Sequence, residues 1–344
     1  MVGALVVHDG EVVGSGWHRH VGGPHAEVEA LREAGPRARG ATLYVTLEPC
    51  SHFGRTPPCA DALLEAGIAR VVACHRDPNP RVSGRGFAKL REAGVEVEVG
   101  TLAAEAVRLN LCFLIAATLG RPEVTLKWAM SLDGRIATVS GESRWISSRE
   151  GRRWALALRE EHDAILVGSG TMLADDPRLD RRLGHAAGPN VRVVLDRRLR
   201  IPPEARLFTV AGSVLIYTEE TRRERYEALT AWGAEVIVLP AVEPASVLAD
   251  LHGRGIQSVL VEGGSEVLAS FVAGGCYDRI MVDCAPLLIG GKGAPGPLAG
   301  AGFPSLDAAA RLEGFEVRRR GDDLVLVGYR KGSVQSLLDA VGAS

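Results

Sequence analysis

Two short stretches of the sequence decide how the first part of this chain folds. The first stretch reads Gly22-Gly23-Pro24-His25-Ala26-Glu27. The second stretch reads Thr46-Leu47-Glu48-Pro49-Cys50-Ser51-His52-Phe53-Gly54-Arg55-Thr56-Pro57-Pro58-Cys59. His25 begins a helical pattern over residues 25–34, and a second pattern covers residues 58–66, where Pro58 in the first turn costs no hydrogen bond. The two stretches therefore predict two helices that begin beside ligand-forming side chains.

The segments around these two helices predict a mixed α/β sandwich. Residues 2–8 and 11–17 are apolar and flank an Asp9-Gly10 turn, which is a hairpin pattern. Further strands are expected at residues 42–47, 70–74 and 95–99, and further helices at residues 86–93 and 102–119. Gly120-Arg121-Pro122 then interrupts the pattern. We therefore expect a first domain over residues 1–120 and a second over residues 121–344.

The rest of the chain alternates apolar runs with helical patterns. The apolar runs lie at residues 123–130, 164–168, 191–196, 213–217, 235–239, 258–261, 279–284 and 323–329. Strands that alternate with helices form a mostly parallel sheet with helices on both faces. The last runs have no helix between them and predict an antiparallel edge. The second domain is therefore expected to be a doubly wound α/β sheet.

The composition and charge of the 344 residues exclude several classes of protein. Hydrophobic residues make up 46% and charged residues 24%, which is typical of a globular core and excludes disordered and fibrous chains. The net charge of −2 offers no positive field to nucleic acid, and no apolar run is long enough to span a membrane. No cleavable signal precedes the first strand, so we expect a cytoplasmic protein whose six cysteines are thiols or metal ligands.

His25, Cys50 and Cys59 together make a set of zinc ligands. A catalytic zinc ion takes three protein ligands and keeps a fourth position open for water. One imidazole and two thiolates supply the three ligands, and helix N-termini favour the thiolate form. Glu27 stands two residues after His25, where it can take a proton from that water and return it to the substrate. This pattern is the signature of the zinc deaminases.

The spacing of the two cysteines sets this chain apart from the general deaminase pattern, in which two residues separate them. Here eight residues separate them, and Asp77-Pro78-Asn79-Pro80 and Gly84-Arg85-Gly86 follow. With these motifs the chain closely resembles, over essentially its whole length, the bifunctional deaminase/reductase family of riboflavin biosynthesis. The resemblance implies a cytidine-deaminase-like α/β/α sandwich as the first domain. It also implies zinc bound by His25, Cys50 and Cys59, with Glu27 as the proton shuttle.

The same resemblance implies where the first substrate binds. His18 and the inserted loop with His52 and Arg55 would line the site of the base and the phosphate. An arginine beside the metal suits a phosphorylated substrate, because its guanidinium matches the geometry of a phosphate. We therefore expect a phosphorylated pyrimidine as the ligand.

The second domain carries further motifs of this family. They are residues 125–135 (TLKWAMSLDGR), 140–146 (SGESRWI), 165–171 (ILVGSGT), 173–177 (LADDP) and 260–265 (LVEGGS). In the last motif a strand runs into a glycine turn and a helix start, where backbone N–H groups can approach a pyrophosphate. Glycine turns after strands are also common without a ligand. Together the motifs resemble a reductase domain with a dihydrofolate-reductase-like fold.

The resemblance also implies which residues contact the ligands of the reductase. The expected NADPH contacts are Ala129, Trp145, Thr171, Asp175, Gly264 and Ser265. The expected substrate contacts are Ser143, Arg159, Leu179, Arg182 and Glu262. Lys127 and Glu262 are the polar groups expected beside the reacting carbon. Asp175 is an alternative in that role, or else a capping carboxylate.

The expected chemistry has two steps. Zinc-assisted deamination replaces the 2-amino group of 2,5-diamino-6-ribosylamino-4(3H)-pyrimidinone 5′-phosphate by oxygen. Hydride from NADPH then reduces C1′ of the ring-opened ribose to a ribityl chain, so the protein mainly has to orient the reactants. Arg197 and Arg198 follow the apolar run 191–196, where a guanidinium can meet a 2′-phosphate, which favours NADPH over NADH. Two solvated arginines would give the same pattern.

Two alternative functions compete with this prediction. A deaminase of tRNA or free nucleosides predicts a short Cys-x-x-Cys spacing and no second catalytic domain, and the sequence contradicts both. The other alternative is an active reductase whose deaminase domain is impaired or serves as a scaffold. In the family a first helix and a loop with Pro-Asn-Pro precede the segment that begins here at Val2, which keeps this alternative open. A homo-oligomer, either a dimer or a tetramer, is also expected.

Overall fold

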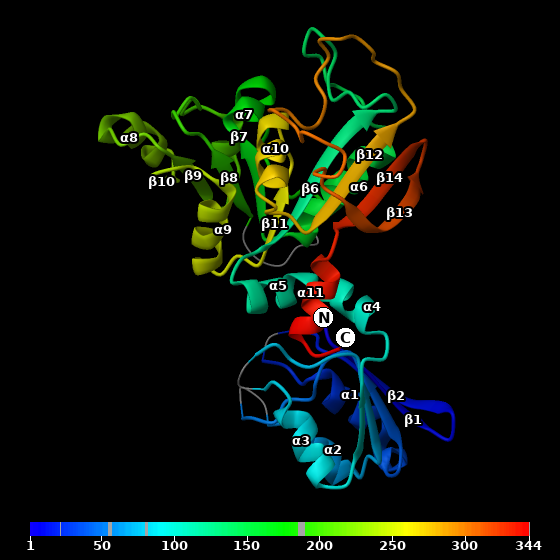
Figure 1. The fold of residues 1–344 in the computed structure, drawn as a ribbon. Helices are drawn as coiled ribbons and strands as arrows, with labels where there is room; N and C mark the ends of the chain where they lie inside the picture. Colours follow the sequence, from blue (N-terminus) through cyan, green and yellow to red (C-terminus); the bar gives the residue numbers. More distant parts are fainter. Residues whose placement is uncertain (21, 54–56, 80–81, 185–189, 344) are drawn as a thin grey trace. The chain divides into compact units, whose positions relative to one another are not determined.

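The chain forms two compact units. The computed structural model describes residues 1–344 except 21, 54–56, 80–81, 185–189 and 344. One unit consists of Met1–Leu119 together with Gly332–Ser344, and the other of Gly120–Lys331 (Figure 1). The division between residues 119 and 120 lies at the glycine where the sequence changes pattern.

The end of the chain differs from the expected second domain over residues 121–344. Its helix α11 (Ser333–Ala340) contacts α4 (Ala103–Leu109) and α5 (Leu111–Leu119) of the first unit. The helix α11 is amphipathic and buries Val334 and Leu337. Its apolar face therefore packs against α4 and α5. Residues 102–119 were expected as one helix, but the structure divides them into α4 and α5 at Asn110.

The first unit is built on a five-stranded sheet in the order β2-β1-β3-β4-β5. The strands are β1 (Gly3–His8), β2 (Glu11–Trp17), β3 (Thr42–Val45), β4 (Arg70–Ala73) and β5 (Glu96–Val99). β1 is antiparallel to β2 and β3, whereas β3, β4 and β5 are parallel. The helices α1 (Ala26–Ala34), α2 (Cys59–Ala66) and α3 (Arg85–Glu92) bury their apolar residues in a core with these strands. The predicted mixed α/β sandwich is confirmed.

Two glycines of β2 allow α1 to approach the sheet closely. A Cβ atom on Gly14 would overlap the carbonyl oxygen of Ala30, and one on Gly16 would overlap that of Ala26. A residue with a side chain at either position would therefore push α1 away from the sheet. This close packing fixes the first turn of α1, which carries the predicted metal ligand and proton shuttle.

The second unit is built on a nine-stranded sheet in the order β10-β9-β8-β7-β11-β6-β12-β14-β13. The strands of its parallel part, which extends from β10 to β12, are β6 (Glu123–Ser131), β7 (Ala164–Gly168), β8 (Val191–Leu195), β9 (Val214–Thr218), β10 (Ala234–Val238), β11 (Ser258–Val261) and β12 (Arg279–Ala285). β14 (Asp323–Arg330) and β13 (Leu312–Arg320) complete it as an antiparallel edge. The predicted doubly wound sheet and its antiparallel edge are confirmed. β13 was not predicted, because its residues are nearly all exposed and show no apolar alternation.

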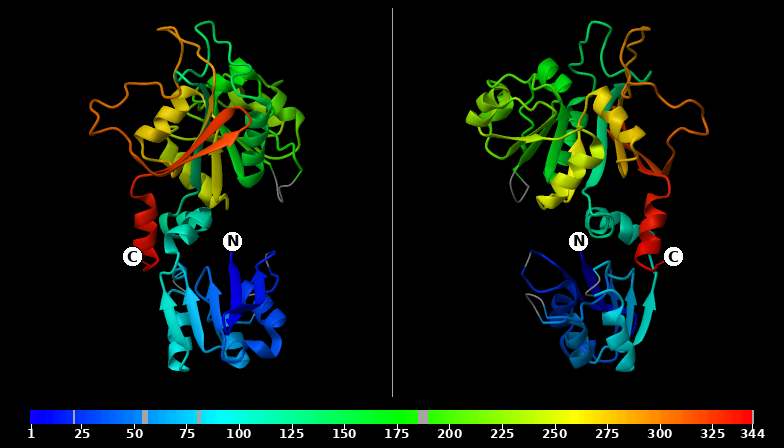
Figure 2. Two further views of the ribbon diagram at one scale, coloured as in Figure 1. Left: turned by 90° about the vertical axis from the view of Figure 1, so that its right-hand side faces the viewer. Right: turned by 60° about the vertical axis from the view of Figure 1, so that its left-hand side comes forward.

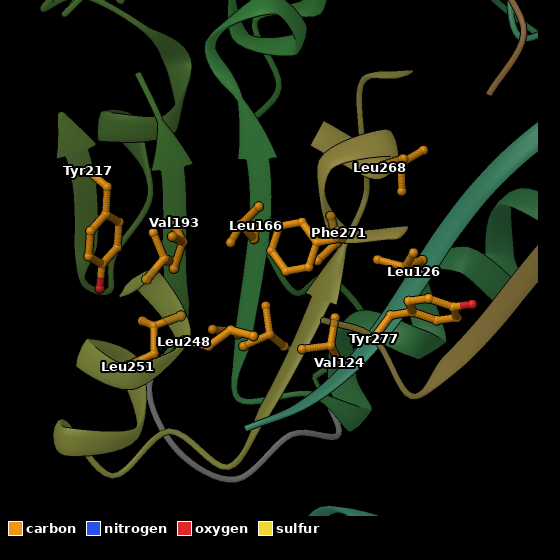
Figure 3. Close-up of a cluster of buried hydrophobic side chains, with 14 of the residues drawn as sticks. Val124, Leu126, Leu166, Val193, Tyr217, Leu248, Leu251, Leu268, Phe271 and Tyr277 are labelled. Atoms are coloured by element: carbon orange, nitrogen blue, oxygen red, sulfur yellow. The ribbon is translucent and has the colours of Figure 1, made fainter. Parts of the chain in front are cut away.

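Helices cover both faces of this second sheet. α9 (Pro244–Gly253) and α10 (Ser265–Ala273) bury Leu248, Leu251, Leu268 and Phe271 against the alternate side chains of β6, β7 and β8 (Figure 3). On the opposite face, Trp154 and Leu158 of α6 (Arg149–Glu161) pack against β11, β12 and β14. The remaining helices of the unit are α7 (Ser169–Asp175) and α8 (Arg223–Ala231). The inner strands of the parallel part are therefore buried on both faces, as their apolar runs predict, whereas the edge strand β10 is only partly buried.

Two long loops leave the carboxyl ends of β6 and β12 and lie side by side. They comprise residues 132–148 and 286–311 and extend from the same edge of the sheet (Figures 1 and 2). The N–H of Ile136 donates to the carbonyl of Pro295, and the carboxylate of Asp133 accepts the N–H groups of Ile289 and Gly290.

Within the described residues no helix is long and apolar enough to cross a membrane.

Candidate functional site

The starts of α1 and α2 hold two of the predicted zinc ligands. His25 is the N-cap residue of α1, with extended backbone angles of φ −74° and ψ 162°, and Cys59 is the first residue of α2. Cys50 lies in the loop that follows β3. The N–H of Cys59 donates to Cys50 Sγ over 3.3 Å, and the N–H of Ala60 donates to the Cys50 carbonyl over 3.1 Å. The first turn of α2 therefore holds the Cys50 side chain in place.

His25, Cys50 and Cys59 form a compact group of metal-ligating atoms. One ligand atom from each residue lies within 4.8 Å of the other two. Nδ1 of His25 is 3.1 Å from Cys59 Sγ and 3.6 Å from Cys50 Sγ. A tetrahedral zinc ion with bonds of about 2.0–2.3 Å requires ligand separations of roughly 3.5 Å. The set therefore fits zinc and leaves one tetrahedral position for a further ligand.

The electrostatics of this group favour a cation. Hydrogen bonds with Cys59 and His25 lower the pKa of the Cys50 thiol to about 4, although burial opposes the shift. The hydrogen bond with Cys50 in turn raises the pKa of His25. Hydrogen bonding to Cys50 and burial raise the pKa of Cys59. One sulfur of the group is therefore anionic near neutral pH, which is the form that binds metal.

Glu27 lies next to the ligand group and is almost completely buried, with 3% of its surface exposed. Burial raises the pKa of its carboxyl group above the ordinary value, and His25 and Cys59 interact with it directly. A carboxyl group with a raised pKa can both accept and return a proton near neutral pH. The structure therefore brings Glu27 to the place where a proton shuttle is needed.

The predicted substrate residues of the first domain are only partly described. His18 follows β2, and its Nδ1 lies 3.0 Å from the Pro24 carbonyl. Its ring meets that of His25 edge to face at 5.4 Å, which brings it to the metal site. His52 is exposed in the loop after Cys50 and interacts electrostatically with Asp77. Arg55 lies outside the described residues.

Glu48 contributes to this site although the sequence analysis gave it no role. Its buried carboxylate accepts the backbone N–H groups of Asp77, Gly84 and Gly86 at 3.2, 2.9 and 2.9 Å. A Cβ atom on Gly86 would overlap the carbonyl oxygen of Pro49, so the glycine allows α3 to begin against this segment. Glu48 thus ties the loop before α3 to the segment that carries Cys50. An acidic residue directly after the predicted strand 42–47 was the available signal in the sequence.

A large cavity opens in the second unit where α7 and α10 begin. Its volume is about 930 Å³. The glycine-containing turns before α7 (Gly168) and before α10 (Gly264) both line it. Thr171, Asp175, Gly264 and Ser265 of the expected NADPH contacts line it, as does Ser143 of the expected substrate contacts. Ala129 and Trp145 do not occur among its described lining residues. Trp145 is instead exposed and lies 4.6 Å beneath the Arg152 guanidinium.

The chemistry of this cavity fits a dinucleotide. The N–H of Gly264 donates to Thr171 Oγ1 over 2.9 Å, which fixes the turn, and α10 then begins at Ser265 without a side-chain cap. Uncapped N–H groups at a helix start attract phosphate groups. Arg197 and Arg198 also line the cavity. Arg197 pairs with Glu219 at 3.7 Å, whereas Arg198 has no ion pair or hydrogen bond within the described residues.

Glu262 and Arg159 form a nearly buried ion pair. Nε and Nη2 of Arg159 donate to the two Glu262 oxygens over 2.8 and 2.6 Å. Burial opposes ionisation of Glu262, but the charges of Arg159 and Lys127 outweigh it and lower its pKa to about 2. Lys127 is on β6, one residue beyond the register pair of Val261 and Leu126. The two predicted catalytic groups of the reductase are therefore neighbours.

Arg159 is also connected, through Asp180, to the other predicted substrate contacts. Its Nη1 donates to the carbonyl of Asp180 over 3.3 Å, and the Asp180 carboxylate pairs with Arg182 at 2.7 Å. Leu179 precedes them and is buried. Asp175 accepts hydrogen bonds from Arg144 at both its carbonyl and its carboxylate, at 2.8 and 3.2 Å. The structure thus brings Arg159, Leu179, Arg182 and Glu262 together, whereas Asp175 lies at the cavity.

Two family models match the chain. Residues 1–75 match the cytidine and deoxycytidylate deaminase zinc-binding region. Residues 122–326 match the RibD C-terminal domain. The first match contains His25, Glu27, Cys50 and Cys59, and the second contains every reductase residue predicted from the sequence.

Other proteins match this chain over most of its length and of their own length. The riboflavin biosynthesis protein RibD of Aquifex aeolicus is 44% identical over 94% of this chain and 90% of its own length. The solved structure of a diaminohydroxyphosphoribosylaminopyrimidine deaminase/5-amino-6-(5-phosphoribosylamino)uracil reductase from Thermotoga maritima is 36% identical, covers 96% of this chain and 91% of that one, and has a TM-score of 0.80. Acinetobacter baumannii RibD is 37% identical over 96% of this chain and 92% of its own, with a TM-score of 0.82.

Proposed function

This chain belongs to the RibD family of bifunctional deaminases and reductases in riboflavin biosynthesis, and we propose the substrates, the cofactor and the residues for its two reactions. The first reaction deaminates 2,5-diamino-6-ribosylamino-4(3H)-pyrimidinone 5′-phosphate. The second reduces the ribosyl group of the resulting uracil to a ribityl chain. The name of the Thermotoga maritima protein supports both substrates.

The deaminase reaction is assigned to the group formed by His25, Cys50 and Cys59. Zinc supplies a Lewis acid that activates water at neutral pH. The three side chains would hold it, since their separations fit its bond lengths. Glu27 takes up a proton as water attacks C2 of the pyrimidine, and it returns the proton to the departing ammonia. His18 lies beside His25, which supports a contact between His18 and the base.

The reductase reaction is assigned to the cavity of the second unit and the charged groups beside it. A nicotinamide cofactor supplies the hydride. We propose NADPH, because the guanidinium of Arg198, which has no partner among the described residues, lines the cavity and can bind a 2′-phosphate. Lys127 protonates the ribose ring oxygen so that the ring opens at C1′. Arg159 holds Glu262 ionised, and the Glu262 carboxylate lies close enough to Lys127 to interact with its charge.

The closeness of His25, Cys50 and Cys59, with buried Glu27 beside them, carries the proposal that the deaminase half is active. The test is to supply purified enzyme, of measured zinc content, with the diaminopyrimidine substrate. Ammonia release without NADPH, followed by NADPH oxidation once it is added, is the expected result. NADPH oxidation only with previously deaminated substrate would mean that the deaminase half is inactive.

We also propose that the protein is a homo-oligomer, either a dimer or a tetramer. Mass determination of the native protein tests this proposal. The cytoplasmic location stays a prediction.

A further inference from the structure

Two buried carboxyl groups of the second unit face each other near Lys127. Asp283 lies on β12 and Asp323 begins β14, and each side chain is 1% exposed. A Cβ atom on Gly151 of α6 would overlap Oδ2 of both residues, so the two oxygens lie against the same small space. Two ionised carboxylates this close together repel each other, and one of them tends to keep a proton.

Hydrogen bonds distinguish the two carboxyl groups. Oδ2 of Asp323 accepts the N–H of Ser148, the N-cap residue of α6, over 2.7 Å, and the helix start favours a negative charge there. Neither oxygen of Asp283 accepts a hydrogen bond of ordinary geometry within the described part of the chain. An O–H group on Asp283 that donates to Asp323 gives this oxygen of Asp283 a partner. Burial and the charge of Asp323 accordingly raise the pKa of Asp283 to about 6.

The strand register connects this pair with the reductase site. β6 and β12 pair Lys127 with Met281 and Ala129 with Asp283. Alternate residues of a strand share a face, so Lys127 and Asp283 both point to the side that α6 covers. The groups that face Asp283 are Asp323 from β14, Lys127 from β6 and the Ser147 hydroxyl before α6. Lys127 therefore lies between Glu262 on one side and Asp283 on the other.

We propose that the Asp283–Asp323 pair stores one proton and supplies it to Lys127 in each reduction cycle. The inference rests on the proposed reductase function, in which Lys127 gives a proton to the ring oxygen. The C1′–O4′ bond breaks as that proton arrives, and the nitrogen lone pair forms a C1′=N bond. C1′ then takes the hydride, and the electron pair of the double bond returns to nitrogen. Asp283 reprotonates the Lys127 amine, and water restores the proton of the pair, so each cycle consumes one hydride and one proton.

The proposal gives the reductase a defined pH dependence. Asp283 can supply a proton only while it is protonated, so the rate falls as the pH rises through the pKa of the pair. Asp283 acts through Lys127 and is a positioning residue for the proton, not a contact of the substrate.

The test measures kcat for NADPH-dependent reduction of the deaminated substrate against pH. Asp283→Asn keeps a donor to Asp323, so it should fold and keep its KM for NADPH. Its kcat should fall about tenfold or more at acidic pH, and the decline with rising pH should disappear. Asp323→Asn should move the decline to lower pH, because the negative neighbour that raises the pKa of Asp283 is gone. Glu150→Gln, an exposed change in the same helix turn, should leave the profile unchanged.

Each outcome separates the two proposals. An Asp283→Asn profile with the wild-type decline overturns the proton store, whereas a wild-type enzyme that reduces nothing contradicts the proposed function instead. If Asp283→Asn does not fold, infrared spectra of the wild type decide the question. A protonated-carboxyl band between about pH 5 and 6, where exposed carboxyls are ionised, supports the store, and its absence overturns it.

Discussion

The two catalytic regions of this chain are built in opposite ways. The proposed zinc ligands come from residues 25–59, and two helix starts and one loop bring them together. The charged groups of the reductase come from separate strands and from α6, and Arg159 lies 103 residues from its partner Glu262. A site made from neighbouring helix starts leaves a recognisable spacing in the sequence. A site made from parallel strands depends on register, which no spacing reveals.

The two regions also balance their charges differently. In the first unit, the pKa of Cys50 is strongly lowered, and the proposed zinc ion would complete the group. In the second unit, Arg159 and Lys127 already compensate the Glu262 carboxylate from within the chain. Loss of one residue should therefore empty the first site of its ion, but should leave an uncompensated buried charge in the second. The following variants test this difference.

The largest effect is expected from Cys59→Ala. The change removes one of three zinc ligands, so zinc per chain should fall from about one to near zero, and deamination should be lost with it. Cys74→Ala is the matched control, because it removes another partly buried thiol of the same unit. Metal analysis after gel filtration measures the effect. Full zinc retention in Cys59→Ala would mean that Cys59 is not a ligand.

Glu27→Gln should separate chemistry from metal binding. The amide cannot carry the proton, so kcat for deamination should fall by roughly 10²–10⁴. Zinc content should not change, because Glu27 is outside the ligand group. Reduction of previously deaminated substrate should also not change, because the reductase residues lie beyond residue 120. Glu29→Gln on the same helix is the control, and loss of both activities in a folded Glu27→Gln protein would contradict the independence of the two sites.

The sequence predicted that the residues of the first region lie close together, since they are near one another along the chain. His25, Glu27, Cys50 and Cys59 were all placed at or beside predicted helix starts, and the structure brings them together. Glu48 was missed because its partners are backbone N–H groups of residues 77–86, and a backbone donor leaves no mark in the sequence.

The second region was predicted through family motifs, and the contacts between its residues came only from the fold. No pattern in the sequence pairs Asp283 with Asp323, because β12 and β14 are joined by a long loop and by an exposed edge strand. The end of the chain was misplaced for a related reason. α11 is amphipathic by itself, but the sequence does not say which unit supplies the surface that covers it.

Glu262→Gln tests the charge balance of the second unit. The substitution leaves the Arg159 guanidinium nearly buried without its counter-ion, which should lower the free energy of unfolding by about 3–5 kcal/mol and slow reduction. Because the folded pKa of Glu262 is lowered to about 2 from a reference of 4.5, its stabilisation is present above about pH 4.5 and is lost as the pH falls toward 2. Urea unfolding at several pH values measures this. The variant should lack that part of the acid sensitivity, and Glu266→Gln, an exposed change on α10, should retain it.

The smallest effect is expected at the rim of the cavity, where Arg198→Ala tests the choice of cofactor. Arg198 is exposed, so its attraction to a 2′-phosphate acts partly through solvent and should be worth about 1 kcal/mol. This corresponds to a rise of roughly five- to tenfold in KM for NADPH. The KM for NADH should stay the same, because that cofactor has no 2′-phosphate.

Arg197→Ala is the matched comparison for Arg198→Ala, since both residues line the same cavity and both are arginines. Arg197 already shares its charge with Glu219, so its loss should change KM for NADPH less than the loss of Arg198 does. Initial rates with both cofactors across the three proteins decide the matter. Equal losses for NADPH and NADH in Arg198→Ala would show that the residue supports the cavity without reading the phosphate. The distribution of arginines at this strand end would then say nothing about cofactor choice, and the preference for NADPH would need another source in the cavity.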